Sequence, residues 1–142
     1  MSETPVVERS RQKIRTALKR WKGNLTKDIE PVFHEFVHAA VERLRGPFLA
    51  QHSPRKILTY LEKTFHFFYE RKSDNVKVVF EPGLRKGLIV MSSMPDQPFI
   101  VDTIRLMLKN HDADYSGGFN LIFNTERDAS GKLTSAGSSC TQ

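Results

Sequence analysis

The sequence predicts an α+β fold, with helices in the first half of the chain and a small antiparallel sheet with one packed helix in the second half. Apolar residues recur every three or four positions up to about residue 72, the spacing of helices with one buried face. From residue 76 the apolar period changes to two, as in strands, and one further helical stretch interrupts it at 98–110. The chain has 142 residues and is 39% hydrophobic, enough for one compact domain, or a domain with a helical extension, with its own core.

A basic helix is predicted at residues 6–22. Its apolar residues share one narrow face: Ile14, Ala17, Leu18 and Trp21. Residues 1–22 hold seven Lys and Arg against two Glu, a net charge of +5, whereas residues 23–142 add only +1 to the total of +6. Such a helix could bind phosphates or an anionic membrane. Because the rest of the chain is near neutral, a solvated arm that packs through Trp21 is the preferred interpretation.

Two further helices complete the predicted helical half. The first spans 30–45, with Pro31 in its first turn and Gly46-Pro47 at its end. The second runs from Pro54 to about residue 72, with Ser53 as its N-cap. Its broad apolar face is that of a core helix and consists of Ile57, Leu58, Leu61, Phe65, Phe68 and Tyr69.

The second half is expected to form one sheet. The predicted strands are 76–82, 88–91 (a central strand), 118–125 and 132–136. The helix at 98–110 should start at Pro98 and bury Phe99 and Ile104 on the sheet. The Asp96 carboxylate should accept hydrogen bonds from the first N–H groups of this helix. A sheet that stops at residue 136 would leave one edge unpaired, and such an edge can pair with another chain.

Residues 34–38 read HEFVH, the spacing by which a helix presents two imidazoles to zinc and a glutamate to water. His34 and His38 would share the flank of the helix, but Arg45 falls on that same flank. No third ligand follows at a recognised spacing, and Glu62 in the next helix is the nearest candidate. We therefore reject His34, Glu35 and His38 as a metal site and predict no metal.

The sequence also lacks the motifs of other enzyme classes. The sequence has no G-x-S-x-G elbow, no phosphate-binding loop and no dinucleotide glycine fingerprint. The single cysteine, Cys140, cannot build a disulfide framework. No apolar run approaches the length of a membrane span, and the first residues lack a signal segment, so a cytoplasmic location is expected.

The most specific stretch runs from residue 87 to 127: strand, proline-bearing turn, amphipathic helix, polar turn and strand. This order resembles the opening of an ACT-type regulatory domain (βαββαβ). Asp96-Gln97-Pro98-Phe99 stands where the general class has Asp-x-Pro-Gly, and Asp96–Thr103 resembles the D-x-P-F-L-V-D-S segment of the large bacterial NAD-specific glutamate dehydrogenases. Two more segments resemble that family, Phe67–Lys72 (F-x-x-E-R-K) and Arg127–Leu133 (R-D-x-x-G-x-L). The resemblance covers about residues 35–134 and leaves out the basic helix.

The resemblance implies a partial ACT-like, ferredoxin-like βαββ unit without the second helix and fourth strand. Charge, apolar pattern and resemblance together divide the chain into a basic helical arm (1–25), a helical region (26–74), an incomplete ACT-like domain (75–137) and a frayed tail (138–142). The ACT-like domain is what the resemblance implies. It implies a regulatory or assembly role in an enzyme that converts L-glutamate to 2-oxoglutarate and ammonia with NAD. No cofactor is expected in this chain, and catalysis would lie elsewhere in the parent enzyme.

The same resemblance implies partners. The chain would pair with the remainder of the parent enzyme or with itself through the ACT-like sheet. A small amino-acid effector would lie near four residues of the first turn: Met94, Asp96, Gln97 and Phe99. The alternatives are a stand-alone ACT-like module for amino-acid sensing or protein interaction, a zinc metallopeptidase built on HEFVH, and a nucleic-acid binder built on the basic arm; no membrane partner is expected.

Overall fold

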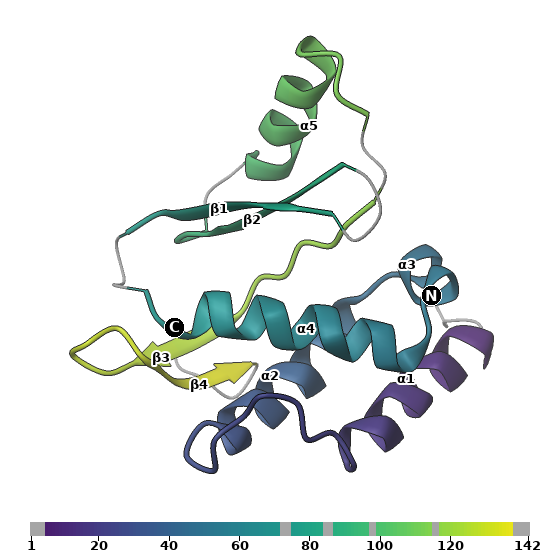
Figure 1. Ribbon diagram of the computed structural model, residues 1–142, viewed down its shortest axis with the longest axis vertical. Coiled ribbons are helices and arrows are strands. Elements are labelled where there is room, and N and C mark those ends of the chain that lie inside the picture. The colour runs from purple at the N-terminus through teal and green to yellow at the C-terminus, as the bar shows by residue number, and fades with distance from the viewer. Residues whose placement is uncertain (1–4, 72–74, 84–86, 97–98, 115–116, 138–142) are drawn as a thin grey trace.

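The computed structural model describes residues 5–71, 75–83, 87–96, 99–114 and 117–137. Helices make up the first part and antiparallel hairpins the second, so the predicted α+β class is confirmed (Figure 1). The helices and strands are α1 (Pro5–Leu18), α2 (Glu30–Arg43), α3 (Gly46–Gln51), α4 (Pro54–Tyr69), β1 (Lys77–Pro82), β2 (Leu88–Ser93), α5 (Ile100–Asn110), β3 (Asn124–Arg127) and β4 (Leu133–Gly137). Among the described residues, no helix has the length and apolarity needed to cross a membrane.

The hydrophobic core lies between α1, α2, α4 and β4. Phe33, Phe36 and Phe65 form its centre, with ring centroids 5.2 Å apart for Phe33 and Phe65 and 5.5 Å apart for Phe36 and Phe65. The apolar stripes of the three helices all face inward, as their spacing predicts. Other fully buried members are Ile14, Leu18, Val37, Ala40, Val41, Leu44, Ile57, Leu58, Leu61, Leu133 and Ala136.

The basic helix α1 is part of this core rather than a separate arm. Arg11 turns inward and is only 6% exposed. Its guanidinium donates from Nε to the carbonyl of Val41 and from Nη2 to that of Leu44, each at 3.0 Å. The last carbonyls of a helix lack partners within the helix and carry partial negative charge, so a cation there satisfies both needs.

Of two helix boundaries, one agrees with the prediction and one differs from it. The Ser53 hydroxyl accepts from the Lys56 N–H at 3.2 Å and Pro54 begins α4, as predicted. Gly46-Pro47, in contrast, begins a further helix, α3, instead of only ending α2. Arg45 is extended, and a proline in the first turn costs no hydrogen bond, so the same dipeptide ends one helix and starts the next.

Strands β1 and β2 form an antiparallel hairpin with two unlike faces. In its register Phe80 lies opposite Val90, and Pro82 lies opposite Leu88. The side chains of one face, called here the inner face, are partly buried toward α4: Lys77, Val79, Glu81, Ile89, Met91 and Ser93. Those of the other face, called here the outer face, are exposed: Val78, Phe80, Pro82, Leu88, Val90 and Ser92.

Helix α5 stands beyond the hairpin, on the side away from α4 (Figure 1). It occupies the predicted position, but none of its residues is buried. The expectation that Phe99 and Ile104 bury it on the sheet is therefore wrong. A two-stranded hairpin is too narrow to cover the apolar stripe of a helix, and no third described strand extends it.

The predicted strand at 118–125 is also corrected. Pairing begins only at Asn124, and β3 pairs with β4 in a sheet separate from the β1–β2 hairpin. The alternation that suggested a strand is real, because Phe119, Leu121 and Phe123 pack against the helical core. Period-two burial against helices gives the same pattern as a strand within a sheet. The predicted tail at 138–142 lies outside the described residues.

The turn between β3 and β4 is held by Asp128. Its Oδ1 accepts from the Ser130 hydroxyl at 2.6 Å, the Ser130 N–H at 2.9 Å and the Lys132 N–H at 3.0 Å. The Ser130 hydroxyl, followed by these N–H groups, lowers the pKa of Asp128 from 3.8. Gly131 follows at φ 89°, the left-handed conformation that glycine adopts without strain.

We expect the Asp128 turn to be sensitive to acid. Because the folded pKa is lower than the unfolded one, the stabilisation is fully present above pH 3.8 and is lost as the pH falls through the folded pKa. An NMR titration should find the Asp128 carboxyl below its unfolded pKa, and Asp128→Asn should remove this pH dependence. Titration of Asp128 at or above the unfolded value would contradict the turn geometry.

Candidate functional site

The HEFVH segment lies on α2, where its third and fourth residues belong to the core. Phe36 and Val37 are 1% and 0% exposed. The Glu35 carboxylate points to β4, where Oε1 accepts from the Ser135 hydroxyl at 2.6 Å and from the Ala136 N–H at 3.0 Å. Glu35 therefore joins the first helical part of the chain to its last described strand.

The other members of the candidate zinc site do not converge. His34 Nε2 lies 3.9 Å from Glu30 Oε1, and His38 is exposed. Glu62 instead accepts from Trp21 Nε1 at 3.3 Å and from the Asn24 N–H at 2.9 Å. Within the described ranges there is no group of three or more His, Cys, Asp and Glu that could hold a metal ion.

We expect Glu35→Ala to lower the free energy of unfolding by about 2 kcal/mol, because two charge-assisted hydrogen bonds to β4 are lost. Glu35→Gln keeps an acceptor oxygen and should lose about half as much. Urea unfolding of the three proteins measures this. A Glu35→Ala protein as stable as the parent chain would show that the contact with β4 contributes nothing.

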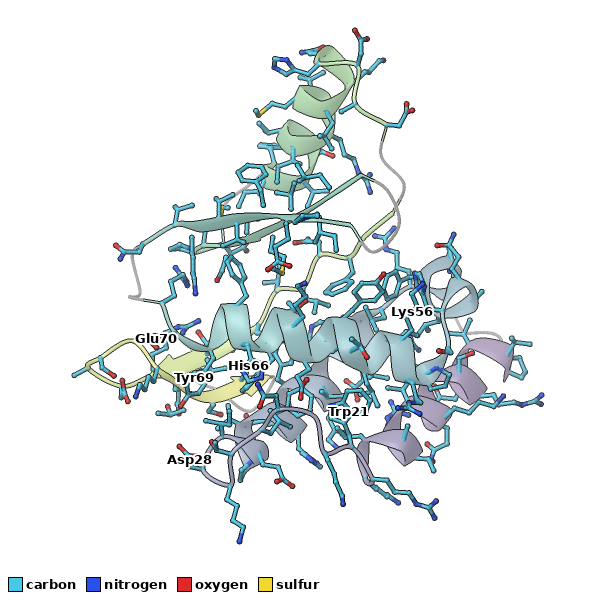
Figure 2. The ribbon with its side chains drawn as sticks, in the orientation of Figure 1. Trp21, Asp28, Lys56, His66, Tyr69 and Glu70 are labelled. Carbon is cyan, nitrogen blue, oxygen red and sulfur yellow. The ribbon has the colours of Figure 1, made fainter. Side chains whose placement is uncertain are left out.

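A second cluster lies at the C-terminal end of α4, where both hairpins meet the helix. From β3, Arg127 donates to the carbonyls of Phe68 (2.9 Å) and Tyr69 (3.1 Å), and also to that of Gly131 (2.9 Å). The Arg127 guanidinium also lies over the Phe68 ring, 4.9 Å from its centroid. Figure 2 shows Tyr69 and Glu70 at this end of α4, beside the β3–β4 hairpin.

Lys77 reaches the same helix end from β1. Its Nζ donates to the carbonyls of Phe67 (2.9 Å) and Glu70 (3.4 Å) and lies over the Phe67 ring at 4.8 Å. Two cations from two different hairpins thus satisfy the last carbonyls of α4, where the helix dipole is negative. We call Lys77, Arg127 and residues 67–70 the α4 clamp.

Polar contacts also hold the β1–β2 hairpin elsewhere along α4. Lys63 of α4 pairs with Glu81 of β1.

Burial, and then the neighbouring Arg71, lowers the pKa of Arg127. Since an arginine starts from a very high pKa, Arg127 stays charged at neutral pH and keeps its place in the α4 clamp.

The expected effector residues lie at the turn between β2 and α5. Met94 is half-buried, Asp96 is exposed, and Gln97 falls outside the described residues. Phe99, not Asp96, occupies the N-cap position of α5, and it makes no side-chain cap hydrogen bond. The role of the four residues in effector binding stays a prediction.

Phe99 has an unusual backbone conformation at this turn. It occupies the N-cap position of α5 with φ 65° and ψ 15°, and its side chain is 76% exposed. This is the left-handed region, which costs a non-glycine residue about 1–2 kcal/mol. Phe99 thus stands where the general ACT pattern has glycine, adopts a conformation that glycine takes without strain, and presents an exposed aromatic ring.

The comparison with known protein families decides between the interpretations of the sequence. The family model described as "Glutamate dehydrogenase, ACT1 domain" matches residues 36–142, most of the chain. The chain belongs to the glutamate dehydrogenase ACT1 domain family. The suspected resemblance is confirmed, and it now extends past the stretch at 35–134 that the motifs cover. No curated protein and no solved structure matches the chain.

In this ACT1 domain, two of the three family-like segments meet at the α4 clamp. The first segment supplies the helix end with Phe67, Phe68 and Tyr69, and Arg127–Leu133 supplies the arginine, the Asp128 turn and the buried Leu133. The third segment, Asp96–Thr103, lies apart and carries Phe99. Sequence reasoning missed that Arg127 and Lys77 share one helix end, because neither spacing nor period links residues 50 positions apart.

Proposed function

We propose that this ACT1 domain is a non-catalytic regulatory or assembly region of an NAD-specific glutamate dehydrogenase. The observation that carries the proposal is the family match over residues 36–142. The parent enzyme would oxidise L-glutamate to 2-oxoglutarate and ammonia with NAD, and this region would influence how the enzyme assembles or responds to effectors.

The described strands support a role away from the NAD site. Dinucleotides bind where parallel strands of βαβ units meet the N-terminus of a helix. Both described sheets are two-stranded and antiparallel. The described strands do not have that arrangement, which supports placing the nicotinamide chemistry in another part of the parent enzyme.

The two unlike faces of the β1–β2 hairpin support a role in assembly. The first hairpin, β1–β2, attaches to the helical core through Lys77 and the Lys63–Glu81 pair, while its outer face stays exposed. An apolar face turned away from its own core is typical of surfaces that contact another protein. The partner would be the remainder of the parent enzyme or a second copy of the chain.

The first test is an assay of the purified chain with L-glutamate and NAD. We expect no formation of NADH, with a complete glutamate dehydrogenase as the positive control. NADH formed by the chain alone would overturn the proposal. Elemental analysis of the chain and of His38→Ala tests the metallopeptidase alternative, which requires stoichiometric zinc that is lost in the variant.

A second test uses a glutamate dehydrogenase that contains this region. Phe80→Asp places a charge on the outer face, and we expect it to change the sedimentation coefficient of the enzyme while NAD affinity stays within twofold. Lys13→Asp, a change of charge on the exposed side of α1, is the control and should leave both unchanged. Loss of NAD affinity in Phe80→Asp would place this region in the catalytic machinery instead.

A further inference from the structure

The solvent-facing side of α1 carries a line of cations, called here the basic row: Arg9, Lys13 and, just after the helix, Arg20. All three side chains are exposed, and intervals of four and seven residues place them along one helix face. The single acidic residue of α1, Glu8, lies on the flank and pairs with Arg15 at 3.1 Å. No acidic side chain in the described part of the chain forms an ion pair with the basic row.

Folding explains the other cations of this region better than it explains Arg9 and Lys13. Arg11 satisfies the last carbonyls of α2, and Lys19 and Arg20 follow the C-terminal end of α1, where the helix dipole favours positive charge. Arg9 and Lys13 lie in the first turns and the middle of α1, and like charges four residues apart repel each other. Two unpaired cations that weaken their own helix indicate a role outside the isolated fold.

The basic row is held in place by the opposite side of α1. Ile14 and Leu18 are 0% and 1% exposed in the core, and Arg11 ties α1 to the end of α2. The Arg20 N–H donates to the Ala17 carbonyl at 3.1 Å, so the chain stays close to the helical path after α1 ends. The cations are therefore presented on a rigid element, which lies on the far side of α4 from the β1–β2 hairpin (Figure 1).

The dimensions of the basic row match those of another helix. From Arg9 to Arg20 the row is about 16 Å long and one side chain wide, at 1.5 Å per residue. A partner helix with Glu or Asp at the same intervals of four and seven would place one carboxylate opposite each cation. Complementary charges arranged in this way give an interface its specificity and its rate of association.

Nucleic acid and lipid fit this surface less well. A duplex is held through about six to ten phosphates, whereas residues 23–142 add only +1 to the charge of the chain. Trp21, the aromatic residue nearest to the row, is half-buried and donates to Glu62, so it offers no base a stacking surface. A helix that lies in a membrane surface buries its apolar face in lipid, but that face of α1 belongs to the core.

We propose that the basic row of α1 binds an acidic helix of a protein other than the parent enzyme. The family match begins at residue 36, so α1 lies outside the part of the chain that matches the glutamate dehydrogenase family. The inference goes beyond the proposed function, since it concerns a different surface and a different partner. It also agrees with the expectation that Lys13→Asp leaves the sedimentation of the purified enzyme unchanged.

Fluorescence anisotropy with two labelled, alanine-based helical peptides of about 20 residues tests the proposal. One peptide carries Glu at intervals of four and seven on a single face, and the other has the same composition with Glu spread around the helix. We expect the full chain to bind the first peptide at least about fivefold more tightly than the second. Raising the salt concentration from 50 to 300 mM should weaken this binding about tenfold.

Variants of the chain show whether the basic row is the site. Arg9→Glu combined with Lys13→Glu should weaken binding of the patterned peptide at least about tenfold, and the pair Arg9→Gln with Lys13→Gln should give a smaller loss. Lys109→Glu is the matched control, a charge reversal on an exposed position of α5, and should bind like the parent chain. Thermal unfolding should show equal melting temperatures within about 2 °C, because these side chains are exposed.

Three outcomes would overturn the proposal. The first is equal binding of the two peptides, or no binding at millimolar peptide. The second is tighter binding of a DNA duplex of about 20 base pairs, or of phosphatidylserine vesicles, at the same salt concentration. The third is an equal loss of binding in Lys109→Glu and in the double variants. All three leave the regulatory or assembly role standing, since the NADH assay and the Phe80→Asp enzyme test that role.

Discussion

Replacing Arg127 by alanine is expected to lower the free energy of unfolding by about 3 kcal/mol, because hydrogen bonds from a charged donor to three carbonyls disappear together. Arg127 donates to the carbonyls of Phe68, Tyr69 and Gly131 and lies over the Phe68 ring. Without it, the last carbonyls of α4 and the Asp128 turn lose their common partner. Urea unfolding monitored by circular dichroism measures the change.

Two further variants show whether the loss comes from the α4 clamp. Arg127→Lys keeps the charge but cannot reach three carbonyls with one ammonium group. Its loss of unfolding free energy should therefore be about half of that in Arg127→Ala. Arg43→Ala removes an exposed arginine that donates one hydrogen bond, to Ala39, and lies over the Phe123 ring. This control should cost less than about 1 kcal/mol. Equal losses in Arg43→Ala and Arg127→Ala would contradict the clamp.

Phe36→Ala is expected to cost about 4 kcal/mol, the range for a fully buried phenylalanine. The Phe36 ring lies 5.5 Å from that of Phe65, 5.7 Å from that of Phe68 and 5.1 Å from that of Phe123, measured between centroids. Its removal opens a cavity where α2, α4 and the segment before β3 meet. Thermal and urea unfolding should both show the loss.

The control for Phe36 is a phenylalanine on the outer face. Phe80 is 65% exposed, so Phe80→Ala should change stability by less than about 0.5 kcal/mol when the chain is dilute. If Phe36→Ala proved as mild as Phe80→Ala, the HEFVH helix would not belong to the core, and a different role for that segment would have to be considered.

The helical half could be predicted closely because each helix combines an apolar stripe with local start signals. Ser53 and Pro54 begin α4 where the sequence predicts, and the stripe of Ile14 and Leu18 is buried as expected. The further helix α3 was missed because Gly46-Pro47 is both a helix stop and a favourable helix start.

The second half could be predicted only in part, since its pattern depends on what each strand faces. Phe119, Leu121 and Phe123 alternate as a strand would, yet they pack on helices without pairing. The stripe of α5 predicts a buried helix, but burial needs a sheet wide enough to receive it. Long-range contacts such as Glu35 with Ser135, or Arg127 with Tyr69, leave no periodic trace.

Hydrogen–deuterium exchange with mass spectrometry, at low and high concentration of the chain, tests most directly whether a firm helical core carries an uncovered ACT-like hairpin. At low concentration, peptides from 77–93 and 100–110 should exchange at least about 100-fold faster than peptides from 33–41 and 57–67. At high concentration, exchange in 77–93 should slow while exchange in the core peptides stays the same. Slow exchange of 77–110 at low concentration, equal to that of the core, would mean that the hairpin is already covered within the chain and would contradict this account.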